Sequence, residues 1–429
     1  MSDNTLREEG RLTADLRQWG TRYKRNLHAS FYLTETGRDY QIDAMKGVAI
    51  ILVLLGHVIT PGFLDQLVYS FHMPLFFFLS GYIAYVSVRK YKPGELLFRR
   101  VKSLLVPFFF MSLVFDLVYN VVLHGASLSA YLRNIALGGP YWFLWALFLC
   151  FLALAAAEEL EKRIGVVAYP IVLVVVMAVL FPIKSIAGQT SLFGLAYLRI
   201  FLIFFFAGFL LSKYRGQSNE LLARYPVYRK ILIGISLGAF PLFIVLGLLS
   251  KSMHDSIFIP YSITPTFTVF AGNLQRTLPL ASYYYFQLVI EAFLGIAFVY
   301  CSLRLIKRGI HWLAWIGFYA IDIYILHSLA NYFAMRWVIN VLAASRIGKL
   351  AVMLVSWQVF VILLTTVVGL AFALFLSIFI VRRNKVLKFL FLGKSGPSKP
   401  DDVISPELPT QMESASTAGQ STVPLDKAD

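Results

Sequence analysis

Three residues of the first hydrophobic segment carry side chains capable of chemistry. Asp43, Lys46 and His57 stand within or beside an apolar run long enough to cross a lipid bilayer. Charged groups are costly there, so their presence favours a functional role. At about 100° per residue, Lys46 and His57 share one helix face, roughly 16 Å apart along the axis, with Asp43 close to that face. Because a neutral imidazole can accept a proton from a hydroxyl, His57 is the candidate general base.

Further polar side chains fall inside other apolar segments, where they must face one another or water rather than lipid. His72 lies at the outer end of the second segment. Tyr324 and His327 share one face of a later segment, with Asp322 on another face. These positions predict a polar cavity that reaches from the midplane to the outer surface. The alternative is that each residue makes a separate hydrogen bond between two helices.

A cluster of basic residues follows the second apolar segment, with six lysines and arginines between positions 89 and 102. Its members are Arg89, Lys90, Lys92, Arg99, Arg100 and Lys102. The excess of Lys and Arg in cytoplasmic loops explains two or three of them. The remainder predict an anionic ligand at the cytoplasmic face, which is either lipid headgroups or the phosphates of a cofactor.

The aromatic run from Tyr141 to Trp145 opens a later apolar segment. Its first interpretation is an aromatic belt at the membrane interface. Its second is a surface on which Trp142 contacts a sugar ring. In the second segment, Gly81 follows Ser80 and permits a neighbouring helix to approach closely.

Composition places the chain among multi-pass membrane proteins. Hydrophobic residues make up 58% of it, charged residues 14%, and the mean hydropathy is +0.70, which is far outside the range of soluble domains. The net charge of +16 follows from membrane topology, so no nucleic-acid partner is expected. Cys150 and Cys301 lie in apolar segments far apart, which predicts buried thiols, and no metal site is expected.

The fold class predicted is all-α, a polytopic bundle of about ten membrane helices in the plasma membrane with both termini cytoplasmic, because most lysines and arginines then lie inside. The predicted spans are about 42–60, 67–88, 103–123, 141–157, 165–183, 193–211, 231–250, 280–303, 312–334 and 350–381.

Three regions are predicted along the chain. Residues 1–38 form a basic cytoplasmic tail that is either an interfacial helix or disordered, and no signal peptide is expected. Residues 39–392 form the membrane domain, whose outer loop at 251–279 folds back over the mouth of the bundle. Residues 393–429 form a disordered cytoplasmic tail.

Several of these motifs together resemble one family. Lys46, ten intervening residues and His57 resemble the Arg/Lys-x10-His motif of the acyltransferase-3 family of integral membrane acyltransferases. The blocks Phe76–Gly81, Arg99–Pro107 and Gly317–His327 are similar to three further motifs of that family, although Ala320 and Ile321 replace its usual Ser-Tyr pair. Trp142-Phe-Leu and Phe204–Gly208 resemble the branch that acetylates sugars.

The resemblance implies transfer of an acetyl group from cytoplasmic acetyl-CoA to a hydroxyl of a carbohydrate, without a metal. His57 is then the base, with Lys46 and Asp43 as further catalytic candidates. The donor candidates are Lys46, Arg99, Arg100, Lys102 and Ser80, and the acceptor candidates are His72, Trp142, Asp322, Tyr324 and His327. His72, Asp43 and Asp322 are candidates to orient His57. Alternatives are a proton-coupled transporter, or transfer of succinyl or another acyl group to an acceptor that is not a sugar. The oligomeric state is open.

Overall fold

The computed structural model describes the greater part of the predicted membrane domain. The described residues are 39–59, 63–113, 117, 121, 125, 127–136, 139, 141–180, 195–249, 274–306, 310–344 and 355–394. The predicted N-terminal tail, most of the 251–279 loop and nearly all of the C-terminal tail lie outside these residues. Every statement below concerns the described residues, and residues Tyr40–Pro397 group by their contacts into one unit.

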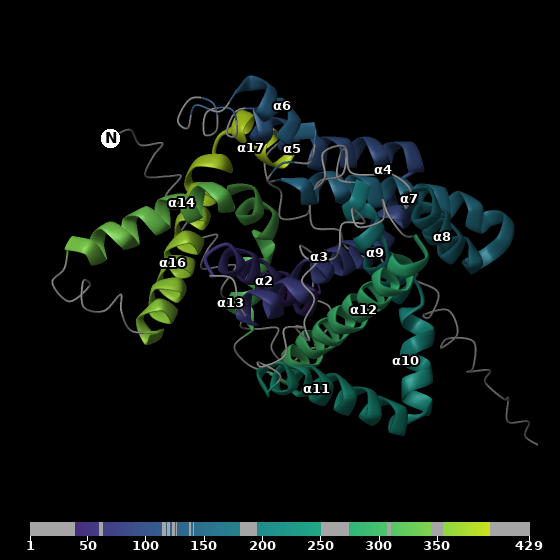
Figure 1. Ribbon diagram of the computed structural model, residues 1–429. Helices are drawn as coiled ribbons and strands as arrows, with labels where there is room; N and C mark the ends of the chain where they lie inside the picture. The colour runs from purple at the N-terminus through teal and green to yellow at the C-terminus, as the bar shows by residue number, and fades with distance from the viewer. Residues whose placement is uncertain are drawn as a thin grey trace, which may run out of the picture. The chain divides into compact units, whose positions relative to one another are not determined.

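Every regular element in these ranges is a helix, as predicted (Figure 1). In chain order they are α2 (Tyr40–Gly56), α3 (Phe63–Lys90), α4 (Pro93–Arg100), the π-helical η1 (Val101–Leu105), α5 (Val106–Phe110), α6 (Leu128–Ala136), α7 (Trp142–Ile164), the 3-10 turn η3 (Gly165–Val167), α8 (Ala168–Leu180), α9 (Leu195–Lys213), α10 (Arg215–Arg224), α11 (Pro226–Leu249), α12 (Leu274–Leu305), α13 (His311–Phe318), α14 (Ala320–Ala344), α16 (Val355–Phe375), the π-helical η6 (Leu376–Val381) and α17 (Lys385–Leu392).

Within the described residues, four helical stretches are long and apolar enough to cross a membrane. Two bent pairs raise the number to six if each pair counts as one span: α9 with α10, which meet at 69°, and α13 with α14, which meet at 76°. The membrane character of the chain is therefore evident in its helices. The count of ten spans and the cytoplasmic termini remain predictions.

The crossing of α3 and α9 depends on two reciprocal glycines. A Cβ atom added to Gly81 would lie 1.9 Å from the carbonyl oxygen of Phe205, and one added to Gly208 would lie 1.9 Å from the carbonyl oxygen of Phe78. Any side chain would therefore push the two backbones apart. The close approach predicted at Gly81 is confirmed, and the Phe76–Gly81 and Phe204–Gly208 motifs turn out to be the two sides of one contact.

The helix that carries Lys46 is held in the same way. Figure 1 shows α13 alongside α2. A Cβ atom on Gly47 would lie 2.0 Å from the carbonyl oxygen of Leu313, and one on Gly317 would lie 1.8 Å from that of Asp43. The glycines of the first and last family-like motifs thus bring α2 and α13 into backbone contact.

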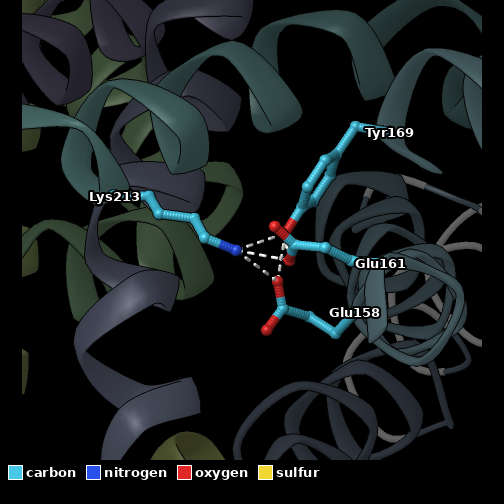
Figure 2. A network of polar contacts seen from close by, with 4 residues as sticks. All are labelled: Glu158, Glu161, Tyr169 and Lys213. Carbon is cyan, nitrogen blue, oxygen red and sulfur yellow. Dashed lines mark hydrogen bonds and ion pairs between the residues drawn. The ribbon is translucent and has the colours of Figure 1, made fainter. Parts of the chain in front are cut away.

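A polar network joins α7, α8 and α9 at one end of these helices (Figure 2). Lys213 forms ion pairs with Glu161 and, at 3.5 Å, with Glu158. The hydroxyl of Tyr169 donates a hydrogen bond to Glu161 at 2.7 Å, and the Lys213 ammonium donates to that hydroxyl at 3.1 Å. Because the four side chains satisfy one another's charges and hydrogen-bonding groups, we interpret this network as a structural link between the three helices.

Candidate active site

The candidate base lies at the end of α2, in contact with a second histidine. The helix ends at Gly56, and the His57 amide still donates to the carbonyl of Val53 at 3.2 Å, so His57 keeps the helical register of α2. The rings of His57 and His327 lie 4.7 Å apart between centroids, at an angle of 33°. His57 is exposed and His327 is buried. Two motifs far apart in the sequence therefore meet at one pair of imidazoles.

The two buried histidines of this region have a defined proton arrangement. Nδ1 of His327 contacts the carbonyl oxygen of Tyr324, and Nδ1 of His72 lies 2.6 Å from that of Val68. Since a carbonyl oxygen only accepts, both Nδ1 atoms carry the proton. When the rings are neutral, each Nε2 is left as an acceptor, and that of His327 lies 3.3 Å from the Ser328 hydroxyl oxygen.

Tyrosines surround His327. Tyr324 stacks on its ring at 5.2 Å, and Tyr141 meets it edge-on at 6.5 Å. Both tyrosines are buried, at 5% and 0% exposure. Tyr324 also packs against Phe143, which follows Trp142 in α7. The predicted polar face of α14 is therefore a packed surface around His327.

Trp142 belongs to a stack of parallel rings next to this surface. Its ring lies 3.9 Å from that of Tyr197 and 5.6 Å from that of Phe201, and Phe201 stacks on Phe77 at 4.6 Å. Trp142 and Tyr197 are half-buried, whereas Phe77 and Phe201 are fully buried. The stack thus runs from the core of the α3–α9 crossing to a partly open end at Trp142 and Tyr197.

The charged residues of α2 pair with each other. The Lys46 ammonium lies 3.1 Å from a carboxylate oxygen of Asp43. Asp43 is buried and Lys46 is partly exposed, with 25% of its side chain accessible. The Asp43 carboxylate therefore orients Lys46. The neighbour of His57 is not Asp43 but His327.

Asp322 has a partner that the sequence did not suggest. The Arg382 guanidinium donates to both carboxylate oxygens, at 2.7 and 3.2 Å, and the Ser377 hydroxyl donates to one of them at 2.5 Å. Arg382 also lies over the rings of Phe318 and Tyr319, at 4.7 and 4.4 Å. The Asp322 carboxylate thus connects the bend between α13 and α14 to the end of the helix formed by α16 and η6. This ion pair, the tie between Asp322 and Arg382, has a structural role.

The basic cluster divides into an inner and an outer part. Arg100 points inward: it donates to the Ser87 hydroxyl at 2.8 Å and lies 4.3 Å from the centre of the Phe151 ring. Its Nε is buried without a hydrogen-bond partner among the described residues. Burial lowers the pKa of the Arg100 guanidinium to about 10, so the group is charged at neutral pH. A buried cation with an unused donor suits an anion.

In the outer part of the cluster, Arg99 is exposed and Lys102 is half-buried. Arg99 lies over Tyr91 at 4.1 Å, and the Lys102 ammonium lies over Phe98 at 4.2 Å. Arg99 also pairs with Glu95 at 2.9 Å. Ser80 is half-buried in α3, directly before the glycine of the α3–α9 crossing.

Sequence reasoning missed Tyr141, Arg382, Ser377 and Ser87 as partners of the candidate residues. Arg382 directly follows an apolar run, where a basic residue is expected from membrane topology alone, so nothing marked it as the partner of Asp322. Among the described residues, no group of three or more His, Cys, Asp or Glu side chains is arranged to hold a metal.

Comparison with known proteins adds a family and two relatives. The sequence pattern of the acyltransferase domain family matches residues 39–379. The nodulation protein NolL of Mesorhizobium japonicum is 25% identical over 259 residues, which cover 56% of this chain and 65% of the relative. NolL of Sinorhizobium fredii is 34% identical over 131 residues, or 27% of this chain and 35% of the relative. The chain thus spans less than two thirds of either relative. No solved structure matches.

Proposed function

Because the chain belongs to the acyltransferase-3 family, we propose that it transfers an acetyl group from acetyl-CoA to a hydroxyl of a carbohydrate. The observation that carries the proposal is the meeting of His57 and His327, at 4.7 Å between ring centroids. A membrane acyltransferase needs a base beside the acceptor hydroxyl, and His57 is the more exposed residue of the pair. Family membership favours acyl transfer over the transporter alternative.

The reaction needs one proton acceptor and no protein nucleophile. His57 takes the proton of the acceptor hydroxyl while the oxygen bonds to the carbonyl carbon of the thioester. The carbon–sulfur bond then breaks, and the CoA sulfur leaves with the proton held by the imidazolium. The buried ring of His327, fixed by its hydrogen bond to Tyr324, would hold the His57 ring in position through their contact.

The donor would enter from the side of the basic cluster. Arg100 is the best-supported contact for the CoA phosphates, because its guanidinium is buried, charged and has an unused Nε donor. Lys46, oriented by Asp43, would bind a phosphate or pantetheine carbonyl or stabilise negative charge on the thioester oxygen. The slender pantetheine arm would reach between helices toward His57.

The acceptor would bind on the other side of His57. The open end of the aromatic stack at Trp142 and Tyr197 offers flat apolar faces for a sugar ring. Tyr324, which stacks on the His327 ring, and His72 remain acceptor candidates. The tie between Asp322 and Arg382 favours a supporting role for Asp322 rather than direct acceptor contact.

Radiolabelled acetyl-CoA supplied to membranes that contain the chain tests the proposal. We expect label on endogenous glycan that mild alkaline hydroxylamine releases, since an ester is cleaved under those conditions. Arg100→Gln should raise the KM for acetyl-CoA about tenfold or more, because a charged hydrogen bond contributes about 1.5–3 kcal/mol. Arg229→Gln, which removes an exposed charge on α11, is the matched control.

The outcome also separates the remaining alternatives. Label transferred from succinyl-CoA but not from acetyl-CoA would show that the acyl group is succinyl and not acetyl. Label found in lipid or peptide would show that the acceptor is not a carbohydrate. Absence of label from every acyl-CoA, in membranes where the protein is folded, would contradict acyl transfer from CoA.

A further inference from the structure

We propose that a strip of basic and aromatic side chains on and around α4 binds the headgroups of anionic phospholipids. The interfacial strip consists of Lys90, Tyr91, Lys92, Phe98, Arg99 and Lys102. The sequence alone left two possible ligands for the basic cluster, lipid headgroups and donor phosphates. We assign the outer part of the cluster to lipid headgroups. The inference does not depend on the proposed reaction.

The position of the strip suits the membrane interface. The apolar stretch of α3 ends at Lys90, and α4 begins at Pro93. The strip therefore occupies the first turns beyond the hydrocarbon region. Phe98 is 58% exposed on α4. An exposed phenyl ring is unfavourable in water, but it is stable at the boundary between headgroups and acyl chains.

Each ring of the strip carries a cation. The Arg99 guanidinium lies 4.1 Å from the centre of the Tyr91 ring, with Lys90 at 5.7 Å on the same ring, and the Lys102 ammonium lies 4.2 Å from the centre of Phe98. A ring inserted at the headgroup level would thus hold its cation at the depth of the phosphates.

The charge of the strip is complementary to an anionic surface. Between residues 89 and 102 the only acid is Glu95, which pairs with Arg99. Lys90 and Lys92 are exposed. Basic residues next to a membrane span attract anionic lipids through these charges. This face is also the one predicted to be cytoplasmic, where anionic lipids are concentrated.

The orientation of the strip argues against a shared role with the donor site. Arg100 turns toward Ser87 and Phe151 inside the bundle, whereas Phe98 and Arg99 are exposed. Arg100 and the exposed cations thus face different surroundings. We therefore assign Arg100 to the donor and the exposed cations to lipid.

Binding of phosphatidylglycerol to the purified, delipidated protein tests the inference. Native mass spectrometry measures the occupancy of phosphatidylglycerol and, for comparison, that of phosphatidylcholine. The proteins compared are wild type, Lys92→Gln/Lys102→Gln and Phe98→Ser. The control is Arg229→Gln/Lys230→Gln, which removes two exposed charges from α11. We expect wild type to prefer phosphatidylglycerol and the strip double variant to lose about 25-fold in affinity, roughly fivefold per charge, with a weaker loss for Phe98→Ser and almost none for the control.

Three results would overturn the inference. Equal losses in the two double variants would mean that overall charge, and not the strip, attracts the lipid. Equal binding of both lipids by wild type would show that the headgroup charge is not recognised. Displacement of bound phosphatidylglycerol by coenzyme A would mean that the strip holds donor phosphates. None of these readouts requires an active enzyme, so failure of the proposed reaction would be seen separately.

Discussion

His57 and His327 make different contributions although their rings touch. His57 is an exposed residue at the end of α2, whereas His327 is buried and its Nδ1 is committed to the carbonyl of Tyr324. A ring fixed in this way restricts the rotation of the ring packed on it. We therefore assign His57 to proton transfer and His327 to the positioning of His57.

The positioning role predicts a specific kinetic change. His327→Ala should lower kcat by about 100-fold with little change in the KM for acetyl-CoA, because a displaced catalytic group reduces the rate by about that factor without affecting a remote donor site. His327→Phe, which keeps a ring against His57, should recover part of the rate. Steady-state kinetics in membranes at matched expression measure both values.

A rise in the KM for acetyl-CoA with an unchanged kcat would contradict this assignment, because His327 would then act in donor binding. Equal rates for His327→Ala and His327→Phe would show that ring packing is not what matters.

At the scale of helices, glycines set the two crossings that hold the site. The α2–α13 contact supports Lys46, and the α3–α9 contact supports the aromatic stack beside Trp142. Gly81→Ala should destabilise the protein by about 1–3 kcal/mol, because its Cβ would meet the Phe205 carbonyl at 1.9 Å and force the backbones apart. Thermal unfolding in detergent measures the loss.

The control for this prediction is Gly234→Ala in α11. A Cβ atom at Gly234 meets nothing within 4 Å, so the substitution should leave stability unchanged or raise it slightly through helix propensity. Similar melting temperatures for the two variants would refute the close contact of α3 and α9.

The tie between Asp322 and Arg382 makes a second prediction at this scale. Removing one partner leaves a buried charge uncompensated, so Asp322→Asn and Arg382→Gln should each cost about 3–5 kcal/mol, and the double variant should cost much less than their sum. Unfolding in mixed detergent micelles gives these free energies. Glu159→Gln, which breaks the exposed pair with Lys162, should leave the unfolding transition almost unchanged, because an ion pair in water contributes little to stability. Strict additivity of the two substitutions would contradict the tie.

At the scale of the whole molecule, periodicity and composition predicted helices, membrane character and the close approach at Gly81, because these depend on local residue types. The Arg382 tie could not be predicted, since a pairing between residues far apart in the sequence leaves no periodic signal. The same limit applies to His57 and His327: each was a candidate, but their contact depends on how α2 and α14 pack. The division of the basic cluster also required the structure, because Arg99 and Arg100 are neighbours that point to different surroundings.

Ten spans with cytoplasmic termini predict which side of the membrane each loop faces. Cys150 and Cys301 are buried, so a membrane-impermeant maleimide should label only introduced cysteines. Gly94→Cys should react in inside-out vesicles and not in intact cells, and Ser129→Cys on α6 should show the opposite. Both positions are exposed. Labelling of both from the same side would contradict the predicted topology.

The most direct test of the central claim is the rate of acetyl transfer in a single turnover, measured for wild type and His57→Gln reconstituted in lipid at equal amounts. Glutamine retains hydrogen bonding but cannot take up the proton. If His57 is the base, the variant should transfer acetyl at least 100-fold more slowly while it unfolds at the same temperature as wild type. A folded His57→Gln variant with a rate close to that of wild type would contradict the account.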